Sequence, residues 1–407
     1  MTKKIDRKFN KDLSTPDPIP QAGMERVQKL MESGRIHRYG EANEDELDVL
    51  MLERDYANMM GTRYCAALNS CGCGLFVALK CVGVKPDDAV LTNAFTLAPV
   101  PGAIAHCNAK PVLVEITGDY TTDLADLRHK AERSGARVLL LSHMRGHIAD
   151  MDRVVALCDE LGITLVEDCA HTMGASWHGR LTGTFGKVGV FSTQTFKHIN
   201  SGEGGLLVTD DEDIAAQAIL YSGSYMLYHQ HGARPDEAVF DRWRGVIPNF
   251  SMRMTNMAAA MLRPQLALLP QRAEVWNRHY AQLEERLSET PYIQLPHRPA
   301  DEAYVASSIQ FTVHDLTVEQ MQNFQECCRK HGVLLKWFGH AQAVGFTSAH
   351  RHWEYVVPTD MAQTDQHLHG LFDMRIPLSL TGEDIDLIAT IIDAAIRAVS
   401  SDVSAFF

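Results

Sequence analysis

The chain has 407 residues, of which 45% are hydrophobic and 22% are charged. This composition is typical of a folded globular protein, and the length suggests one large domain with a smaller one attached. The formal net charge of −13 argues against nucleic acid or an anionic membrane as the main partner, although a locally basic site could still bind an anionic ligand.

The nine cysteines show no paired zinc-type spacing, because Cys71-Gly72-Cys73 is tighter than the usual C-x-x-C pair. We therefore expect no metal site, and the scattered thiols favour a reducing cytoplasm. The charged first residues contain no apolar segment, and no apolar run reaches membrane-spanning length. We expect neither a signal peptide nor a membrane partner.

In chain order, hydrophobic periodicity and turn residues predict a polar arm and then strands that alternate with helices. Helices are expected at 24–32, closed by Gly34, and at 44–60, after a turn at 40–43. Strands are expected at 64–68, 89–93, 111–115, 138–142, 163–167, 188–191 and 206–209. Helices are expected at 75–82 and 152–161, and a further helix follows 94–96 and runs through 105. This alternation indicates an α/β fold with a mostly parallel sheet.

Beyond residue 255 the pattern changes. A long helical stretch, 255–287, is interrupted near Pro264 and Pro270. A strand at 303–314, a helix at 318–331, a strand at 333–337 and a last helix at 383–399 follow, and they predict a small α+β domain. The expected parts are an N-terminal arm (1–20), a large domain (21–265), and a connecting helix with a small C-terminal domain (266–407).

The first strand leads into a run of small residues, Asn69-Ser70-Cys71-Gly72-Cys73-Gly74, and then into a helix. The free N–H groups and the dipole of a helix N-terminus favour an anion such as phosphate. Small residues at such a junction are more often only a tight turn. The run by itself therefore identifies no ligand.

Asp168 stands where the strand 163–167 stops, in the sequence Glu167-Asp168-Cys169-Ala170-His171. Ligands of open α/β sheets bind at the carboxyl ends of strands. A carboxylate there could keep the pyridine nitrogen of pyridoxal phosphate (PLP) protonated, so that the ring accepts electrons. The alternatives are a helix N-cap for Asp168 and a polar residue beneath a loop for His171.

Lys197 lies between the strands 188–191 and 206–209, followed by Gly202, Gly204 and Gly205. A lysine held there is poorly solvated and loses its proton readily. A neutral amine attacks carbonyl groups and forms a Schiff base with PLP. For an arbitrary lysine, a place on a sheet edge near a turn would be the more common explanation.

Together these motifs resemble the DegT/DnrJ/StrS-type sugar aminotransferases, a branch of the fold-type I PLP-dependent enzymes. The strand before E-D-C-A-H is followed, 29 residues after Asp168, by Lys197 in the core K-x-x-x-x-G-E-G-G. Further segments occur in the family's order, namely Ser33-Gly34-Arg35, Asn93-Ala94-Phe95-Thr96, the run at 144–152 and Arg253-Met254-Thr255. The resemblance implies a large domain with a seven-stranded-type sheet flanked by helices.

The resemblance implies a role for each matching residue. Lys197 would form the internal aldimine and move the proton, and Asp168 would pair with the pyridinium nitrogen. His171 would lie near the cofactor's phenolic oxygen, and Phe95 would cover its ring. The phosphate would be bound by the hydroxyl of Ser192 and by the turn of Ser70, Cys71 and Gly72.

The chain departs from the family pattern at two phosphate contacts. The family's Ser-Gly-Thr is Ser70-Cys71-Gly72 here, which removes a threonine hydroxyl. The family's Asn-Tyr-Arg, whose asparagine reaches the partner subunit's phosphate, is Ser251-Met252-Arg253, and Asn249 or Ser251 could take over that contact. These changes leave the expected lysine and aspartate chemistry untouched.

The stretch 221–249 is rich in aromatic residues and histidines and has little periodicity. It reads as a loop, and a loop this long in a compact enzyme is often functional. In the family this region lies at a dimer interface and reaches the neighbouring active site. The resemblance therefore implies a homodimer with shared active sites.

We conclude from the sequence that the protein is a PLP-dependent aminotransferase that moves an amino group from glutamate or glutamine to a keto- or aldehydo-sugar or a sugar-like cyclitol. One alternative is a sugar dehydratase of the same family, but such enzymes commonly replace the lysine with histidine, and His198 only stands beside it. If the local backbone is extended, we expect the side chain of His198 to point away from that of Lys197. The other alternative is a cofactor-binding regulatory protein, against which Lys197, Asp168 and Ser192 argue.

Overall fold

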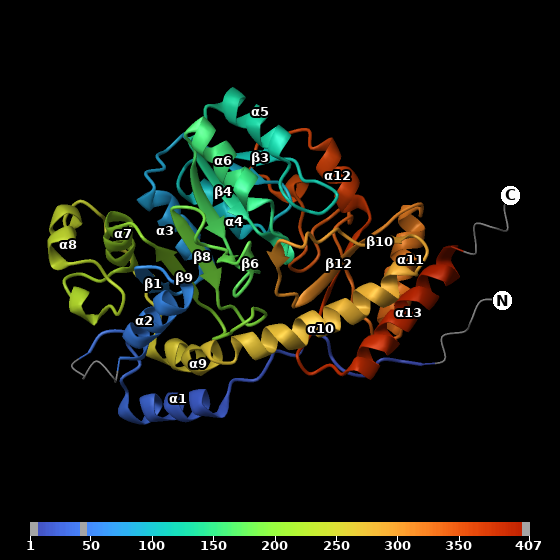
Figure 1. Cartoon of the computed structure of the whole chain (residues 1–407), viewed down its shortest axis with the longest axis horizontal. Helices are drawn as coiled ribbons and strands as arrows, with labels where there is room; N and C mark the ends of the chain where they lie inside the picture. The colour runs from blue at the N-terminus through green and yellow to red at the C-terminus, as the bar shows by residue number, and fades with distance from the viewer. Residues whose placement is uncertain (1–6, 41–46, 401–407) are drawn as a thin grey trace.

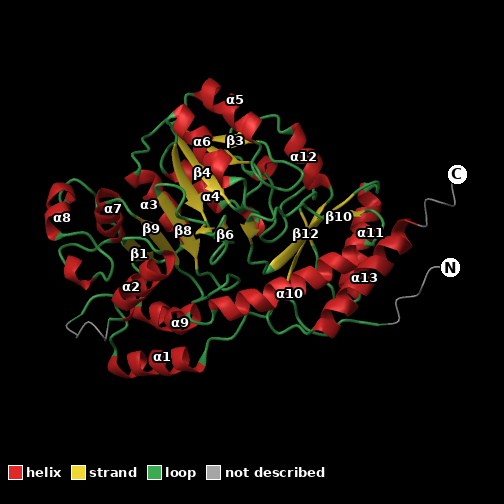
Figure 2. Ribbon diagram, viewed as in Figure 1, coloured by secondary structure: helices red, strands yellow, loops and turns green. Residues whose placement is uncertain are grey.

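The structure is a computed structural model that describes residues 7–40 and 47–400. Its largest sheet has seven strands in the order β1-β9-β8-β5-β4-β2-β3, with helices on both faces (Figure 1 and Figure 2). The strands are β1 (Tyr64–Leu68), β2 (Ala89–Asn93), β3 (Lys110–Val114), β4 (Val138–Ser142), β5 (Thr164–Asp168), β8 (Val188–Ser192) and β9 (Gly205–Thr209). The neighbours from β8 to β3 pair in parallel, and β9 runs antiparallel to β1 and β8. The predicted α/β fold is confirmed.

Successive side chains of the central strands enter two different hydrophobic clusters. In β4, Leu139 and Leu141 belong to the cluster that includes residues of α5 and α6, whereas Leu140 belongs to the cluster that includes residues of α3 and α4. All five residues of β4 are buried. A strand covered by helices on both faces is apolar throughout, which explains the continuous hydrophobic runs of the sequence.

The large domain contains more helices than the sequence predicts, and α2 begins later than expected, at Asp48. The predicted helices correspond to α1, α2, α3, α4, α6 and α9, whereas α5, α7 and α8 were not predicted. The residues 44–46 of the helix expected at 44–60, and 41–43 of the turn before it, lie outside the described residues. The helices are α1 (Gln21–Ser33), α2 (Asp48–Met60), α3 (Cys71–Cys81), α4 (Pro99–His106), α5 (Leu124–Ser134), α6 (Met151–Leu161), α7 (Glu212–Ser222), α8 (Glu237–Trp243) and α9 (Asn256–Leu266).

Several strands of the large sheet end at the same edge of the sheet. Because β9 is antiparallel to both of its neighbours, β1 runs in the same direction as β8 and the other parallel strands. The residues that end β1, β2, β4, β5 and β8 therefore lie along the same carboxyl edge. This is the edge at which open α/β sheets bind their ligands.

The C-terminal part contains a second sheet of four antiparallel strands, in the order β10-β12-β14-β13. The predicted break in the long helical stretch falls between α9 and α10, since Pro264 stays inside α9 and Pro270 enters the first turn of α10. The strand expected at 333–337 shrinks to β13, and β14 was not predicted. The elements are α10 (Leu269–Ser288), β10 (Ile293–Gln294), β12 (Ser308–Val313), α11 (Val318–Lys330), β13 (Lys336–Trp337), α12 (Ala362–His369), β14 (Leu371–Arg375) and α13 (Gly382–Ser400).

Short elements connect the two sheets. A small three-stranded sheet joins β11 (Glu302–Ala303) to β6 (Ser176–Trp177) and β7 (Arg180–Leu181). The described residues also form the short 3-10 turns η2 (Met144–Gly146), η3 (Tyr228–Gln230) and η4 (His350–His352). The two main sheets come from separate stretches of chain, as the proposed division at residue 265 requires, although the boundary itself remains a prediction.

The N-terminal arm packs on the C-terminal part rather than on the large sheet. The amide of Phe9 donates to the carbonyl of His331 at 2.9 Å, and Phe9 and Leu13 are 2% and 3% exposed. Lys11 pairs with Asp384 at 2.6 Å. The described residues of the arm are thus anchored by both apolar and ionic contacts. Among the described helices, none is both long and apolar enough to cross a membrane.

Candidate active site

Lys197 lies in the turn between β8 and β9, at the carboxyl edge of the large sheet. Its Nζ is 2.9 Å from Nε2 of His171. Burial, together with the positive charge of Arg145, lowers the pKa of Lys197 to about 8, although Asp168 acts in the opposite direction. An amine with this pKa is partly neutral near pH 7, and a neutral amine is nucleophilic.

His171 is buried beside this amine. Burial and the charges of Lys197 and Arg145 hold the pKa of His171 well below its ordinary value. The imidazole is therefore neutral near pH 7, and its Nε2 can accept a hydrogen bond from Lys197. The alternative role of a polar residue beneath a loop does not account for this direct contact.

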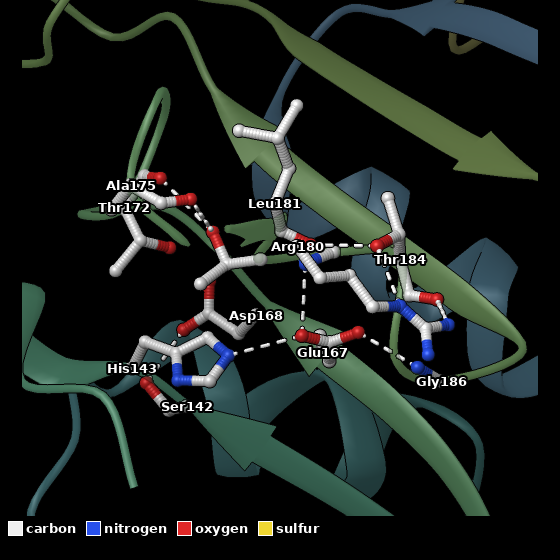
Figure 3. A network of polar contacts seen from close by, with 12 residues as sticks. Ser142, His143, Glu167, Asp168, Thr172, Ala175, Arg180, Leu181, Thr184 and Gly186 are labelled. Carbon is white, nitrogen blue, oxygen red and sulfur yellow. Dashed lines mark hydrogen bonds and ion pairs between the residues drawn. The ribbon is translucent and has the colours of Figure 1, made fainter. Parts of the chain in front are cut away.

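Asp168 is the last residue of β5 and lies beside Ser142 (Figure 3). Both of its carboxylate oxygens are held in place. The hydroxyl of Ser142 donates to Oδ2 at 2.7 Å, and the amide of Ala170 donates to Oδ1 at 3.1 Å. A turn rather than a helix follows Asp168, so the alternative role of a helix N-cap is wrong. The strand end instead presents a fixed carboxylate at the edge where Lys197 lies.

The neighbouring Glu167 points to a different set of donors (Figure 3). It accepts from the amides of Gly183 and Gly186, both at 2.8 Å, and lies 3.2 Å from Nε2 of His143. Together with Cys169, these side chains form a buried group whose ligand atoms lie within 4.8 Å of one another. Because the carboxylate already accepts hydrogen bonds from both amides, we interpret the group as the support of the 183–186 loop rather than as a metal centre.

The small-residue turn forms the start of α3. Ser70 is the N-cap, and its Oγ accepts from the amide of Cys73 at 3.1 Å. First-turn amides of a helix lack intrahelical acceptors, and those of Cys71 and Gly72 meet no acceptor among the described residues. The Sγ of Cys71 lies 4.0 Å from Oδ1 of Asp168. The helix start and the carboxylate thus belong to one site.

Close contacts explain one glycine of the K-x-x-x-x-G-E-G-G core. A Cβ on Gly205 would lie 2.5 Å from the carbonyl oxygen of Ser70. Only glycine therefore lets β9 run so close to the turn that begins α3. Gly205 pairs with Ser192, the last residue of β8. The Oγ of Ser192 accepts from the amide of Gln194 at 3.3 Å.

Phe95 lies beyond the end of β2 and is 1% exposed. Its ring packs edge-on against Phe338, with centroids 5.1 Å apart, and against Tyr120 at 6.1 Å. These contacts fix the ring between the large sheet and the C-terminal part. The position of this ring over a flat ligand stays a prediction.

Comparison with known proteins identifies the family. The model of the DegT/DnrJ/EryC1/StrS aminotransferase family matches residues 19–393. The chain belongs to this family.

Individual relatives agree with this assignment. A putative L-glutamine:3-amino-2,3-dideoxy-scyllo-inosose aminotransferase of Micromonospora echinospora is 35% identical over 208 residues, which cover 51% of this chain and 47% of that protein. The spore coat polysaccharide biosynthesis protein SpsC of Bacillus subtilis is 28% identical over 62% of this chain and 64% of its own. The matched segments thus span 47% of the first relative and 64% of the second, less than two thirds of either.

Solved structures agree on the fold. The aminotransferase TlmJ of Streptoalloteichus hindustanus superposes with a TM-score of 0.80 at 19% identity, over 95% of this chain and 98% of that one. At this identity the likeness shows the fold alone. The fold in question is the two-sheet arrangement described above.

Two of the predicted site residues of this family member lie apart from the others. Asn249 is exposed, and its Nδ2 donates to the carbonyl of Leu220 at 2.6 Å. Ser251 is exposed and accepts from Nη2 of Arg253 at 2.5 Å. Their segment runs beside the end of β1, since the amide of Asn69 donates to the carbonyl of Met252 at 2.8 Å. Neither side chain contacts another predicted site residue of the described chain.

The structure also brings residues to the site that the sequence analysis did not single out. Ser142 follows a predicted strand, so its place at the carboxyl edge could have been inferred. Arg145 stands in the family-like run at 144–152 but was given no role. Lys336 lies in the strand expected at 333–337 but was given no role, and Asp373 carried no signal because β14 was not predicted. Only the fold brings these two residues near Lys197.

Proposed function

We propose that this protein is a PLP-dependent aminotransferase that moves an amino group from glutamate or glutamine to a keto- or aldehydo-sugar or a sugar-like cyclitol. The observation that carries the proposal is Lys197, an amine with a pKa of about 8, at the sheet edge that also fixes Asp168. The family membership and the name of the Micromonospora echinospora relative support it.

The residues present fit PLP. The unpartnered amides of Cys71 and Gly72 at the N-terminus of α3 suit a phosphate. Asp168, held by Ser142, suits a protonated pyridine nitrogen, Phe95 suits a flat ring, and Lys197 suits an aldehyde. When bound, PLP supplies an electron sink for the carbon that loses its proton.

Each side chain then has a defined task. Lys197 would hold the cofactor through its aldehyde and, once its Nζ is free, would move a proton between two carbons on one face of the site. Neutral His171 accepts a hydrogen bond from Nζ and orients it. Asp168 would keep a proton on the pyridine nitrogen, because a carboxylate favours the charged form of its partner. Ser142 holds that carboxylate in place, and Ser192 with the turn at Ser70 would bind the phosphate.

The retained lysine favours transamination over dehydration. A dehydratase must not return the proton to the cofactor, so a proton-carrying lysine there is a disadvantage. His198 does not replace it, because Nε2 of His198 lies 3.3 Å from the carbonyl of Val305 and the ring packs on Trp276, at a centroid distance of 5.2 Å.

Product analysis tests the proposal. The purified protein is loaded with PLP and incubated with glutamate or glutamine and a panel of keto-sugars and ketocyclitols. We expect one amino sugar for each molecule of 2-oxo acid released, with an unchanged number of hydroxyl groups. A deoxy-keto product without nitrogen would replace the proposal with dehydration.

We further propose that the protein is a homodimer in which the segment 221–253 completes the neighbouring site. This segment exposes large apolar side chains that would be covered by a second copy: Tyr225, Met226, Val246 and Phe250 are 63%, 72%, 64% and 66% exposed. Asn249 and Ser251 lie in the same segment. Mixing two inactive variants, Lys197→Ala and Asn249→Ala/Ser251→Ala, should restore activity through hybrid dimers, and a fully active monomer would exclude this arrangement.

A further inference from the structure

Three charged side chains from different elements meet beside Lys197. Arg145 belongs to η2, just after β4, Lys336 to β13 and Asp373 to β14. Nη2 of Arg145 lies 3.1 Å from Oδ2 of Asp373, and Nζ of Lys336 lies 3.4 Å from the same oxygen. We call Arg145 and Lys336 the basic pair.

Packing places the basic pair against the candidate active site from two directions. A Cβ on Gly146 would lie 3.1 Å from the carbonyl oxygen of His171, so the turn that carries Arg145 touches the residue next to Lys197. The guanidinium carbon of Arg145 also lies 6.0 Å from the centre of the Phe338 ring, which packs on Phe95. Arg145 therefore adjoins both the amine and the ring proposed to cover the cofactor.

The charges of this group do not balance. Asp373 is the single carboxylate against the two cations, and its Oδ1 already accepts from Gln310 at 2.7 Å. The side chain of Arg145 is only 10% exposed, and its Nε has no hydrogen-bond partner among the described residues. Lys336 keeps 41% of its side chain exposed. One positive charge and one buried donor are thus left for another anion.

Arg375, the last residue of β14, provides a contrast to Arg145. Arg375 donates to the carbonyl of Thr15 at 2.6 Å and pairs with Asp17 at 3.3 Å, so its acceptors come from the N-terminal arm. Arg145 instead has a left-handed backbone conformation, with φ of 56°. Such a conformation is unfavourable for a side chain other than glycine and is often found at functional sites.

We propose that Arg145 and Lys336 bind the α-carboxylate of the amino-acid donor. This rests on the proposed aminotransferase function, because only a donor whose amine reaches the position of Lys197 brings a carboxylate so near. A guanidinium matches a carboxylate with two parallel hydrogen bonds. A keto-sugar without an acidic group offers hydroxyls only. The charge of Arg145, which contributes to the lowered pKa values of Lys197 and His171, agrees with an anion-binding region.

The test separates the two half-reactions of the PLP-loaded protein. Arg145→Gln and Lys336→Gln remove one charge each, and Arg145→Lys keeps the charge but not the paired geometry. The matched control is Arg329→Gln on α11, where the arginine is 61% exposed and pairs with Glu326. Because Arg145 is buried, thermal unfolding is measured for each variant, and the partly exposed Lys336 supplies a second variant that is less prone to unfold.

We expect Arg145→Gln to raise the KM for both glutamate and glutamine about tenfold to a hundredfold, with a much smaller change in kcat. Amination of a neutral keto-sugar by the pyridoxamine phosphate form should stay within about twofold when it is measured at a pH above the pKa of Lys197 in both proteins. Glutarate, which has carboxylates but no amine, should compete with glutamate in the wild-type protein and in Arg329→Gln but not in Arg145→Gln.

Two outcomes of this test would contradict the proposal. Unchanged KM values for both donors in Arg145→Gln and Lys336→Gln would overturn the subsite. A loss confined to keto-sugars that carry an acid group would show that the anion belongs to the acceptor. If the wild-type protein transfers no amine, the proposed function fails. Even then, the anion subsite can be tested by thermal unfolding with glutarate. Stabilisation by glutarate that is kept in Arg329→Gln but lost in Arg145→Gln would support the subsite, and no stabilisation of the wild-type protein would overturn the subsite.

Discussion

Glu53 and Asp373 are two of the buried carboxylates that pair with arginines, and the groups around them differ in charge balance. Glu53 of α2 accepts from Nη2 of Arg38 at 2.8 and 2.9 Å and from the amides of Ala67 and Gly232. Burial and the charge of Arg38 lower the pKa of the adjoining His231 to about 4, so it is neutral near pH 7. Asp373, in contrast, faces two cations, Arg145 and Lys336.

This difference separates a structural ion pair from a site that can receive a ligand. The Glu53 group joins α2, β1 and the segment near residue 232, with Arg38 and Glu53 at 1% and 0% exposure. Burial alone would raise the pKa of Glu53, but Arg38 and His231 lower it to about 2. The Asp373 group keeps an excess positive charge beside Lys197. Substitutions around Glu53 should therefore change stability, and substitutions around Lys197 should change the reaction.

The largest effect is expected for Lys197→Ala on the reactive side. Turnover should fall by about 10⁴-fold, because the nucleophile and the proton carrier are the same group. The free energy of unfolding should not fall, since a poorly solvated amine is removed. Borohydride reduction of the PLP-loaded wild-type protein, followed by peptide mapping, should find the cofactor on Lys197. A label on Lys187 instead would contradict the assignment.

Glu53→Gln should have the largest effect on the structural side. Removing the carboxylate leaves Arg38 buried and unpaired, which we expect to cost about 3–5 kcal/mol in the free energy of unfolding. Denaturant titration measures this loss, and Glu326→Gln on the surface of α11, where the ion pair is screened by solvent, should leave the free energy of unfolding unchanged within error. Folded Glu53→Gln protein should retain its turnover. A stable but inactive variant would show that the Glu53 group takes part in the reaction.

Asp168→Asn should reduce the rate of the half-reaction with glutamate by about 10²–10³-fold. An amide cannot hold the pyridine nitrogen protonated as a carboxylate does, whereas its oxygen can still accept from Ser142. We expect the variant to fold and to bind PLP, as absorbance spectra would show. A half-reaction rate near that of the wild-type protein would leave Asp168 with a structural role only.

Arg145→Gln should alter the pH dependence of cofactor uptake. Only the neutral amine of Lys197 reacts, so uptake by the apo-protein should rise with pH around the pKa of about 8. Arg145 lowers this pKa by repelling the ammonium form, so the variant should need a higher pH, by up to about one unit. Stopped-flow uptake rates between roughly pH 6 and pH 10 measure the shift, because this range brackets the pKa of Lys197. An unchanged midpoint, or a shift of equal size in Arg329→Gln, would contradict the proximity of this charge.

His198→Ala should have the smallest effect on the reaction. Burial and the charge of Lys197 lower the pKa of His198 to about 4, and its ring is directed toward Trp276 and Val305. We expect the turnover of folded protein to change by no more than about twofold, a difference of under about 1 kcal/mol. Comparison of kcat with the wild-type protein checks this. Loss of activity in His198→Ala with activity retained in Lys197→Ala would reverse the two roles.

Features that depend on neighbouring residues were predictable from the sequence. The strands β1, β2 and β4 begin and end where the hydrophobic runs predicted, and Gly34 closes α1 with φ of 71°. The expectation that His198 points away from Lys197 agrees with the structure, but the reason given for it was wrong. The segment is a turn, in which the amide of Lys197 donates to the carbonyl of Gln194 at 2.9 Å, and not extended backbone.

Other elements were missed because local patterns are weak there. The stretch 221–249 contains α8, a seven-residue helix that packs on α7, although its aromatic residues and histidines show little periodicity. The strand β14 was missed because its buried residues include Asp373. A buried aspartate interrupts the hydrophobic run by which strands are recognised.

By itself the sequence determined the α/β fold, the family resemblance, the placement of Asp168 at a strand end and that of Lys197 between two strands. It could do so because strands, turns and glycine-rich loops depend on residues close together in the chain. Only the tertiary structure decided which charges surround the amine. Arg145, Lys336 and Asp373 are separated by up to 228 residues (373 − 145), and their contacts arise because the C-terminal sheet packs against the carboxyl edge of the large one.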